Sequence, residues 1–162
     1  MFKERKVKKE YLAIVEGVAG GVGESRTLHN YYAKDEKARK AIVREKQDLS
    51  TVFECKAESP APTKPIWEII TKYTVLATNN THSYLRVEPI TGRFHQIRAH
   101  LAFVGHPLAG DKKYGGKPTK HARNQLLHCH RLCVDYNMGM SFEAPMPENF
   151  ARCTKEWFTG VT

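Results

Sequence analysis

The sequence lacks several features that mark whole classes of proteins. No apolar stretch approaches the roughly 18 residues that a membrane-spanning helix needs. The first eleven residues, MFKERKVKKEY, are highly charged and contain no apolar segment of the kind that signal peptides carry. We therefore expect a cytoplasmic protein with no membrane partner. Its four cysteines should then be reduced thiols, because disulfides are rare in that compartment.

Motifs of common enzyme and metal-binding classes are also missing. There is no Walker loop, no nucleophile elbow and no Ser-His-Asp order. The glycine-rich segment 17–23 has the wrong spacing for a dinucleotide site, so it predicts a turn. Soft ligands crowd together at 128–133, but a strand there would send alternate residues to opposite faces, and no second ligand pair lies at zinc-finger spacing. We expect neither a metal nor a cofactor.

Acidic residues are less frequent than basic residues. Lys and Arg number 26 against 17 Asp and Glu, which gives a net charge of +9. Such a basic domain attracts polyanions, of which nucleic acid is the common one, although a basic protein without such a partner remains an alternative. With 162 residues and 41% hydrophobic residues, the chain is long and apolar enough for one packed domain.

Short apolar and alternating runs between turn residues predict a largely β structure. The clearest signal is a hairpin in which 66–78 and 82–90 flank the turn Asn79-Asn80-Thr81. Helical spacing occurs at 94–104 and again near the end of the sequence. The other expected elements are strands at 10–17, 49–57, 125–136 and 141–144, a turn at 137–139 and a closing helix at 148–158.

The order of these elements has no alternation of strands and helices. It predicts an α+β fold, with a mixed, mainly antiparallel β-sheet and a few flanking helices. The charged segment 34–46 is expected to be a short solvated helix or a mobile loop. The proline-rich segment 59–65 predicts a loop inside a single domain spanning 1–162, because neither side alone could form a core.

The densest group of polar residues follows the predicted strand 82–90. After the turn Thr91-Gly92 come Arg93, His95, Gln96, Arg98 and His100, and then a loop rich in glycine. Two guanidinium groups at the start of a helix suit a phosphate or a carboxylate. Two ordinary surface arginines are the alternative interpretation of the same pattern.

These residues lie in a run that resembles a known family. Residues 90–116, ITGRFHQIRAHLAFVGHPLAGDKKYGG, resemble the third motif of the RluA-type RNA pseudouridine synthases. Residues 7–17 resemble the tyrosine-bearing strand of that family, and 126–150 resemble its C-terminal strand pair. The resemblance implies a catalytic domain that converts uridine to pseudouridine in structured RNA, either rRNA or tRNA. It implies no DNA partner and no cofactor or metal.

The resemblance also implies roles for single residues. In this family an aspartate performs the covalent or proton-abstracting chemistry, a tyrosine stacks on the target base and can serve as a base, and a basic residue pairs with the aspartate. By motif position, the tyrosine is Tyr11 and the basic residue is Arg98. The expected RNA-binding residues are Arg93, His95, Gln96, Lys112 and Lys113.

The sequence departs from the family at the aspartate. The family carries it in a His-Arg-Leu-Asp stretch before Thr-Ser-Gly, upstream of the tyrosine strand, whereas only ten residues precede Tyr11 here. His130-Arg131-Leu132-Cys133 has cysteine in place of aspartate, and Asp111 matches a different family position. We therefore expect the C-terminal half of a catalytic domain, inactive alone.

Three interpretations of this half-domain stay open: a fragment of a longer protein, half of an enzyme completed by a partner chain, or a non-catalytic RNA-binding relative. A missing half would leave a sheet edge or an apolar face uncovered. We therefore expect either a homodimer or a complementing chain.

Overall fold

The computed structural model describes residues 7–45, 66–134 and 139–159. The strand predicted at 49–57 and the loop predicted at 59–65 lie outside the described residues, as does most of the turn predicted at 137–139.

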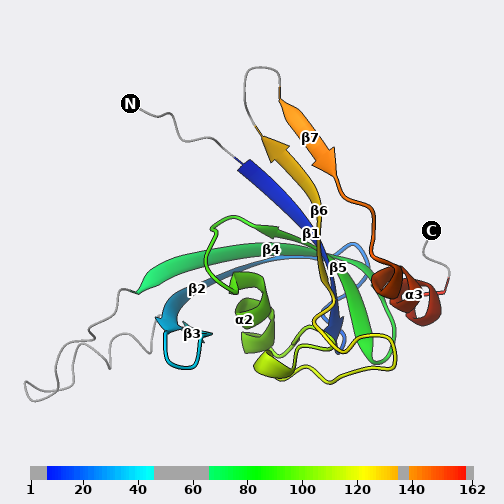
Figure 1. Ribbon diagram of the computed structural model, residues 1–162, viewed down its shortest axis with the longest axis horizontal. Helices are drawn as coiled ribbons and strands as arrows, with labels where there is room; N and C mark the ends of the chain where they lie inside the picture. Colours follow the sequence, from blue (N-terminus) through cyan, green and yellow to red (C-terminus); the bar gives the residue numbers. More distant parts are fainter. Residues whose placement is uncertain (1–6, 46–65, 135–138, 160–162) are drawn as a thin grey trace, which may run out of the picture.

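One antiparallel sheet dominates the described part of the chain (Figure 1). Its strand order is β3-β2-β4-β5-β1-β6-β7, and each ladder between neighbours is antiparallel. The strands are β1 (Val7–Glu16), β2 (Ser25–Asp35), β3 (Lys40–Arg44), β4 (Trp67–Thr78), β5 (His82–Pro89), β6 (Leu127–Val134) and β7 (Met140–Glu143). The helices are α2 (Gln96–Phe103), a short 3-10 helix η1 (Lys112–Tyr114) and α3 (Glu148–Trp157). This arrangement confirms the predicted α+β fold and the predicted hairpin.

The prediction of a helix or a mobile loop at 34–46 was wrong. Strand β2 continues to Asp35, the chain turns, and β3 returns beside it with Ala33 opposite Ile42. Arg39 takes a left-handed conformation in this turn, with φ of 47°. The segment forms a hairpin because Ala41 is buried against the core while its charged neighbours Lys40 and Arg44 remain exposed.

Strand β1 lies inside the sheet and is covered on both faces, as its apolar pattern predicts. Leu12 and Ile14 pack in one cluster with side chains of α3, whereas Ala13 and Val15 pack in another with side chains of α2. Successive residues of a strand point to opposite faces, so one strand serves two cores. Full burial of a side chain such as Ile14 contributes roughly 1.5–3 kcal/mol.

The loop between α2 and β6 is fixed to β1 by backbone hydrogen bonds. The N–H of Ala109 donates to the carbonyl of Ile14, at 2.9 Å, and the N–H of Ile14 donates to the carbonyl of Leu126, at 3.1 Å. Within this loop, the N–H of Gly116 donates to the carbonyl of Asp111, at 2.8 Å. The loop is therefore an ordered extension of the sheet, and it holds Asp111 in one place.

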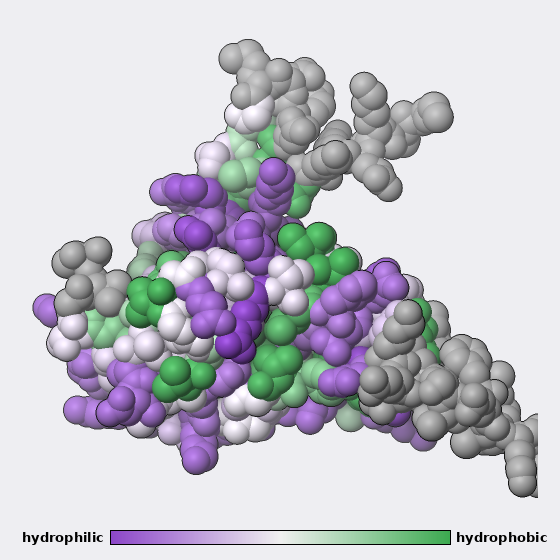
Figure 2. Space-filling view, turned by 180° about the vertical axis from the view of Figure 1, so that it is seen from behind, coloured by the Kyte–Doolittle hydropathy of each residue, from purple (hydrophilic) through white to green (hydrophobic). Residues whose placement is uncertain are grey.

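The outer strands of the sheet are β3 and β7. On β7, Met140 and Phe142 are exposed, and they lie opposite Val134 and Leu132 of β6. From behind, the molecule shows hydrophilic residues over much of its surface, interrupted by separate hydrophobic patches (Figure 2). Among the described residues, no helix combines the length and the apolar character that crossing a membrane would require.

Gly116 has no room for a side chain. A Cβ atom there would lie 2.0 Å from the carbonyl oxygen of Leu108 and 2.8 Å from the amide nitrogen of Asp111. We predict that Gly116→Ala lowers the free energy of unfolding by about 1–3 kcal/mol, the usual cost of forcing atoms into a packed region. Urea denaturation measures this change. Gly92→Ala is the matched control, since a Cβ at Gly92 meets no atom within 4 Å. Equal stability of the two variants would contradict the prediction.

Candidate functional site

A cleft of about 500 Å³ opens beside the N-terminus of α2. Strand β1 supplies one wall, and the segment from the end of β5 into α2 supplies the other. Its lining residues are Val7, Lys9, Tyr11, Pro89, Ile90, Thr91, Gly92, Arg93, Phe94, His95, Gln96, Ile97, Arg98 and Leu127. Both predicted catalytic residues and three of the predicted RNA-binding residues therefore meet at one cleft.

The other two predicted RNA-binding residues do not line this cleft. Lys112 and Lys113 are exposed on η1, directly after Asp111. The charge of Lys113 nevertheless contributes to lowering the pKa of His95. The two lysines are thus neighbours of the site and not part of its wall.

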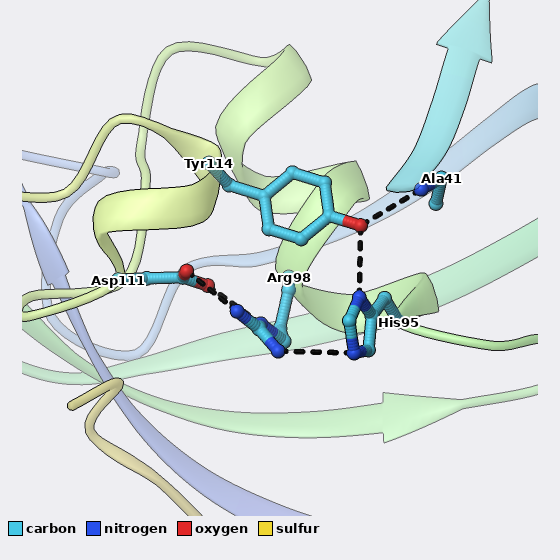
Figure 3. Close-up of polar contacts among 5 residues, drawn as sticks. All are labelled: Ala41, His95, Arg98, Asp111 and Tyr114. Carbon is cyan, nitrogen blue, oxygen red and sulfur yellow. Dashed lines mark hydrogen bonds and ion pairs between the residues drawn. The ribbon is translucent and has the colours of Figure 1, made fainter. Parts of the chain in front are cut away.

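Arg98 is held in place by Asp111 (Figure 3). Its Nε–H donates to Oδ2 of Asp111 and its Nη2–H donates to Oδ1, both at 2.7 Å. The carboxylate is only 1% exposed and the guanidinium side chain 14%. The ring of Tyr114 lies beside the guanidinium, 5.1 Å from Cζ to the ring centroid. Hydrogen bonding to Asp111 raises the pKa of Arg98, so this group stays charged.

His95 connects Arg98 to the edge of the sheet. Arg98 can only donate, so its Nη1–H donates to Nε2 of His95, at 3.1 Å. The ring proton of His95 is then on Nδ1, which donates to the hydroxyl oxygen of Tyr114, at 3.0 Å. The N–H of Ala41 donates to the same oxygen, at 2.8 Å (Figure 3). Burial and the charges of Arg98 and Lys113 lower the pKa of His95, which favours this neutral form.

Gln96 is buried, and its amide is fully used by the protein. Its Oε1 accepts from the hydroxyl of Thr91, at 2.9 Å, and from the N–H of Arg93, at 3.1 Å. Its Nε2 donates to the carbonyl of Ile70, at 3.0 Å, and to the hydroxyl of Thr71, at 3.1 Å. Gln96 therefore fixes the turn that carries Arg93, and it ties that turn to β4.

The network continues through His100, which is fully buried. The hydroxyl of Thr71 donates to Nδ1 of His100, and Nε2–H of His100 donates to Oδ1 of Asn30, both at 2.9 Å. Burial, with a smaller contribution from the charge of His29, lowers the pKa of His100 to about 4. The sequence placed His100 in the basic segment, but its ring is an uncharged link between α2, β4 and β2.

Tyr11 is half-buried at an irregularity in the pairing of β1 with β6, between Glu10 and Tyr11. Burial raises the pKa of Tyr11, and the neighbouring Cys129 thiol raises it further. The phenol is therefore neutral near pH 7, which favours a stacking surface over a phenolate base.

The rim of the cleft carries aromatic rings beside cations. Phe94 stacks on the ring of His95, with centroids 3.8 Å apart and planes inclined by 20°. Cζ of Arg93 lies 4.9 Å from the ring centroid of Trp67, and Nζ of Lys34 lies 5.4 Å from that of Phe94. Sequence reasoning missed Phe94, Trp67 and Lys34. Phe94 had a signal, since it stands between Arg93 and His95 in the motif run.

No aspartate or glutamate is among the lining residues of the cleft in the described part of the chain. The carboxylate bound to Arg98 belongs to Asp111, whose two oxygens are both engaged in that pair. Among the described residues, this cleft therefore has aromatic rings and cations but no carboxylate that could serve as nucleophile or base.

The described residues form no cluster of three or more His, Cys, Asp or Glu side chains suited to a metal ion. His128 and His130 do face one side of β6, as strand geometry predicts, since both contact the carbonyl of Ala144, at 3.2 and 3.3 Å.

Residues 1–103 match the family model described as RNA pseudouridylate synthase. The chain belongs to this family. The match confirms the resemblance seen in the motif run and in the strand of Tyr11.

Comparison with individual proteins also finds members of this family. An uncharacterized RNA pseudouridine synthase of Helicobacter pylori (strain J99) is 35% identical over 149 residues, which is 92% of this chain and 51% of the relative. The ribosomal large subunit pseudouridine synthase D of Blochmanniella floridana is 31% identical over 170 residues, covering 91% of this chain and 46% of the relative. The chain spans about half the length of these relatives.

The fold agrees with a solved structure. Human RNA pseudouridylate synthase domain containing 4 superposes with a TM-score of 0.65 at 18% identity, over 91% of this chain and 61% of the human chain. At that identity the likeness supports the fold alone.

The pair of Arg98 and Asp111 generates a stability prediction. Asp111→Asn keeps the shape of the side chain but leaves the Arg98 guanidinium without its counter-charge in a largely buried site. Removing one partner of such a pair costs about 3–5 kcal/mol, and we expect a loss near the lower end because Arg98 keeps some solvent contact. Urea denaturation tests this. The control is Glu148→Gln, which breaks the exposed pair of Glu148 with Arg152 and should change stability little. Equal losses would contradict the prediction.

His100 generates a pH prediction. A histidine in the unfolded chain has a pKa near 6.5, whereas His100 in the folded chain has a pKa of about 4. Between these values the unfolded state binds a proton that the folded state excludes. The free energy of unfolding should therefore fall by about 3 kcal/mol as the pH drops from about 6.5 to about 4, and His100 should add little pH dependence above about pH 7.5, where its imidazole is neutral in both states.

Denaturation of the wild type and of His100→Gln across this pH range tests the prediction. The variant should have a flatter profile, and His130→Gln, outside the network, should keep the wild-type slope. Parallel profiles for the wild type and His100→Gln would show that the histidine does not titrate as proposed.

Proposed function

We propose that the cleft binds the target uridine of an RNA pseudouridine synthase, with this chain providing the tyrosine and arginine side of the active site. The observation that carries the proposal is the convergence of Tyr11, Arg93 and Arg98 on one cleft. Family membership supports the reaction class, which exchanges the N-glycosidic bond of uridine for a carbon–carbon bond at C5 and releases the C5 hydrogen.

Each residue has a role that its surroundings permit. A uridine turned out of its stack needs an aromatic surface, which the neutral ring of Tyr11 offers. Its phosphates need cations, which Arg93 and Lys9 offer at the cleft wall. Arg98 donates three of its five N–H groups to Asp111 and His95, so two remain for a further anionic group.

The catalytic carboxylate is proposed to come from outside this set of residues. Arg98 is fixed by Asp111 and His95 before any such group arrives, so an incoming aspartate would meet an oriented guanidinium. We propose that a complementing polypeptide brings the aspartate, because a second copy of the chain would lack it as well. The exposed side chains of Val7, Met140 and Phe142 offer apolar surface on β1 and on the sheet edge β7.

The RNA is proposed to be structured ribosomal or transfer RNA in the cytoplasm. The net charge of +9 supports binding to a polyanion. A relative from Blochmanniella floridana carries the large ribosomal subunit in its name, which favours ribosomal RNA.

A second candidate function is RNA binding without catalysis. The bidentate pair of Arg98 with Asp111 favours it, because the guanidinium already has a carboxylate partner that does not line the cleft. The two candidates differ in turnover and agree in RNA affinity.

Tritium release from RNA labelled at uridine C5 tests the proposal. The chain alone should release no tritium above background, because no described residue that lines its cleft carries a carboxylate. Addition of the half of the Helicobacter pylori relative that this chain does not match should produce release. That release should be lost in Arg98→Ala and retained in Arg152→Ala, an exposed control on α3. Turnover by the chain alone would contradict the missing-carboxylate argument.

RNA affinity distinguishes the two RNA functions from a function that involves only a protein partner. Wild-type chain should bind ribosomal RNA at low salt, with weaker binding in Arg93→Ala. Binding without release in the complemented mixture would favour the non-catalytic candidate. Absence of binding at low salt would contradict both RNA functions and favour a protein partner.

A further inference from the structure

Phe94 is an exposed aromatic ring at the mouth of the cleft. The residue is 45% exposed. It lines the cleft together with its neighbours Arg93 and His95. Its exposed face is therefore available to a ligand that enters the cleft.

The ring of Phe94 is fixed by contacts within the chain. His95 stacks on it at 3.8 Å, and the imidazole is itself fixed by Arg98 and Tyr114. The backbone is fixed too. The N–H of Arg93 donates to the side chain of Gln96, and His95 occupies a left-handed conformation with φ of 54°. A flat ring fixed before binding loses little conformational entropy when a ligand stacks on it.

Arg93 provides a second flat group on the same rim. Its guanidinium lies over the indole of Trp67, 4.9 Å from Cζ to the ring centroid. Trp67 in turn packs against Tyr32, with ring centroids 6.0 Å apart. Arg93 is exposed, so its guanidinium is accessible to a ligand. Unpaired bases stack on both aromatic rings and guanidinium planes.

The charges around this rim favour a nucleic acid over a protein. Nζ of Lys34 lies 5.4 Å from the centroid of Phe94, and the charged residues of the cleft wall are Lys9, Arg93 and Arg98. An apolar protein surface docking on Phe94 would have to strip water from these cations without neutralising them. A nucleic acid strand offers bases to the rings and phosphates to the cations together.

We propose that Phe94 and the pair of Arg93 with Trp67 form a stacking platform for the unpaired nucleotides that flank the uridine in the cleft. The inference rests on the proposed RNA function and adds to it a stacking surface at the mouth of the same cleft. Its consequence is a preference for single-stranded or loop RNA, because paired bases present no free face for stacking.

The test uses a short uridine-rich single-stranded RNA that carries 2-aminopurine beside one uridine, with the wild-type chain and with Phe94→Leu. Leucine keeps an apolar side chain but removes the ring. Loss of stacking should weaken binding between about fivefold and about a hundredfold and should reduce the quenching of 2-aminopurine. The dependence of affinity on salt should stay the same, since no cation is lost. Arg93→Lys, which keeps the charge but not the plane, should also reduce the quenching.

The control is Phe103→Leu. Phe103 is 39% exposed at the other end of α2 and does not line the cleft, so this variant should behave as the wild type. Equal affinity and quenching for Phe94→Leu and Phe103→Leu would overturn the platform while leaving the RNA function intact. A wild-type chain that binds no RNA at low salt would overturn the RNA function itself. Self-association that only Phe94→Leu abolishes, with unchanged RNA affinity, would assign the ring to a protein contact and also overturn the platform.

Discussion

The pair of Arg98 with Asp111 determines how the rest of the site is arranged. A charged guanidinium is costly to bury, and here it is buried only because a carboxylate and an imidazole use three of its donors. Asp111 reaches it because the loop after α2 is fixed to β1. The tautomer of His95 follows from Arg98, since a group that only donates requires an acceptor. Removing the carboxylate would therefore disturb more than one contact.

A second, uncharged network supports the first. Gln96 and His100 point from α2 into the sheet, and their hydrogen bonds join β2 and β4 to the turn that carries Arg93. Buried polar groups stabilise a single arrangement only when each has a partner, as these have. The helix start is thus fixed from two sides, by an ion pair toward the loop and by neutral hydrogen bonds toward the sheet. Groups on the cleft wall are oriented before any ligand arrives.

Sequence reasoning predicted the elements whose signals are local. The alternation of apolar and polar residues on both sides of a turn predicted β4 and β5. The helical spacing of apolar residues, followed by a glycine, predicted α2. Sequence reasoning failed at 34–46, where many residues are charged and, of residues 34–45 that the structure describes, the small residue Ala41 alone is fully buried. For the site, the resemblance of residues 7–17 pointed to Tyr11 and the motif run 90–116 pointed to Arg98, and both residues line one cleft. The partner of Arg98 could not be predicted, because it depends on how a loop folds back on β1, and that is a matter of tertiary contacts.

The hydroxyl of Tyr114 accepts from the backbone N–H of Ala41 and also from the ring of His95. One oxygen atom therefore joins an outer strand of the sheet to the imidazole beside Arg98. If β3 separates from α2, that oxygen loses a donor and the ring of His95 loses a fixed neighbour. Strand β3 and the cleft are therefore connected through the hydroxyl of Tyr114, although they are far apart in the sequence.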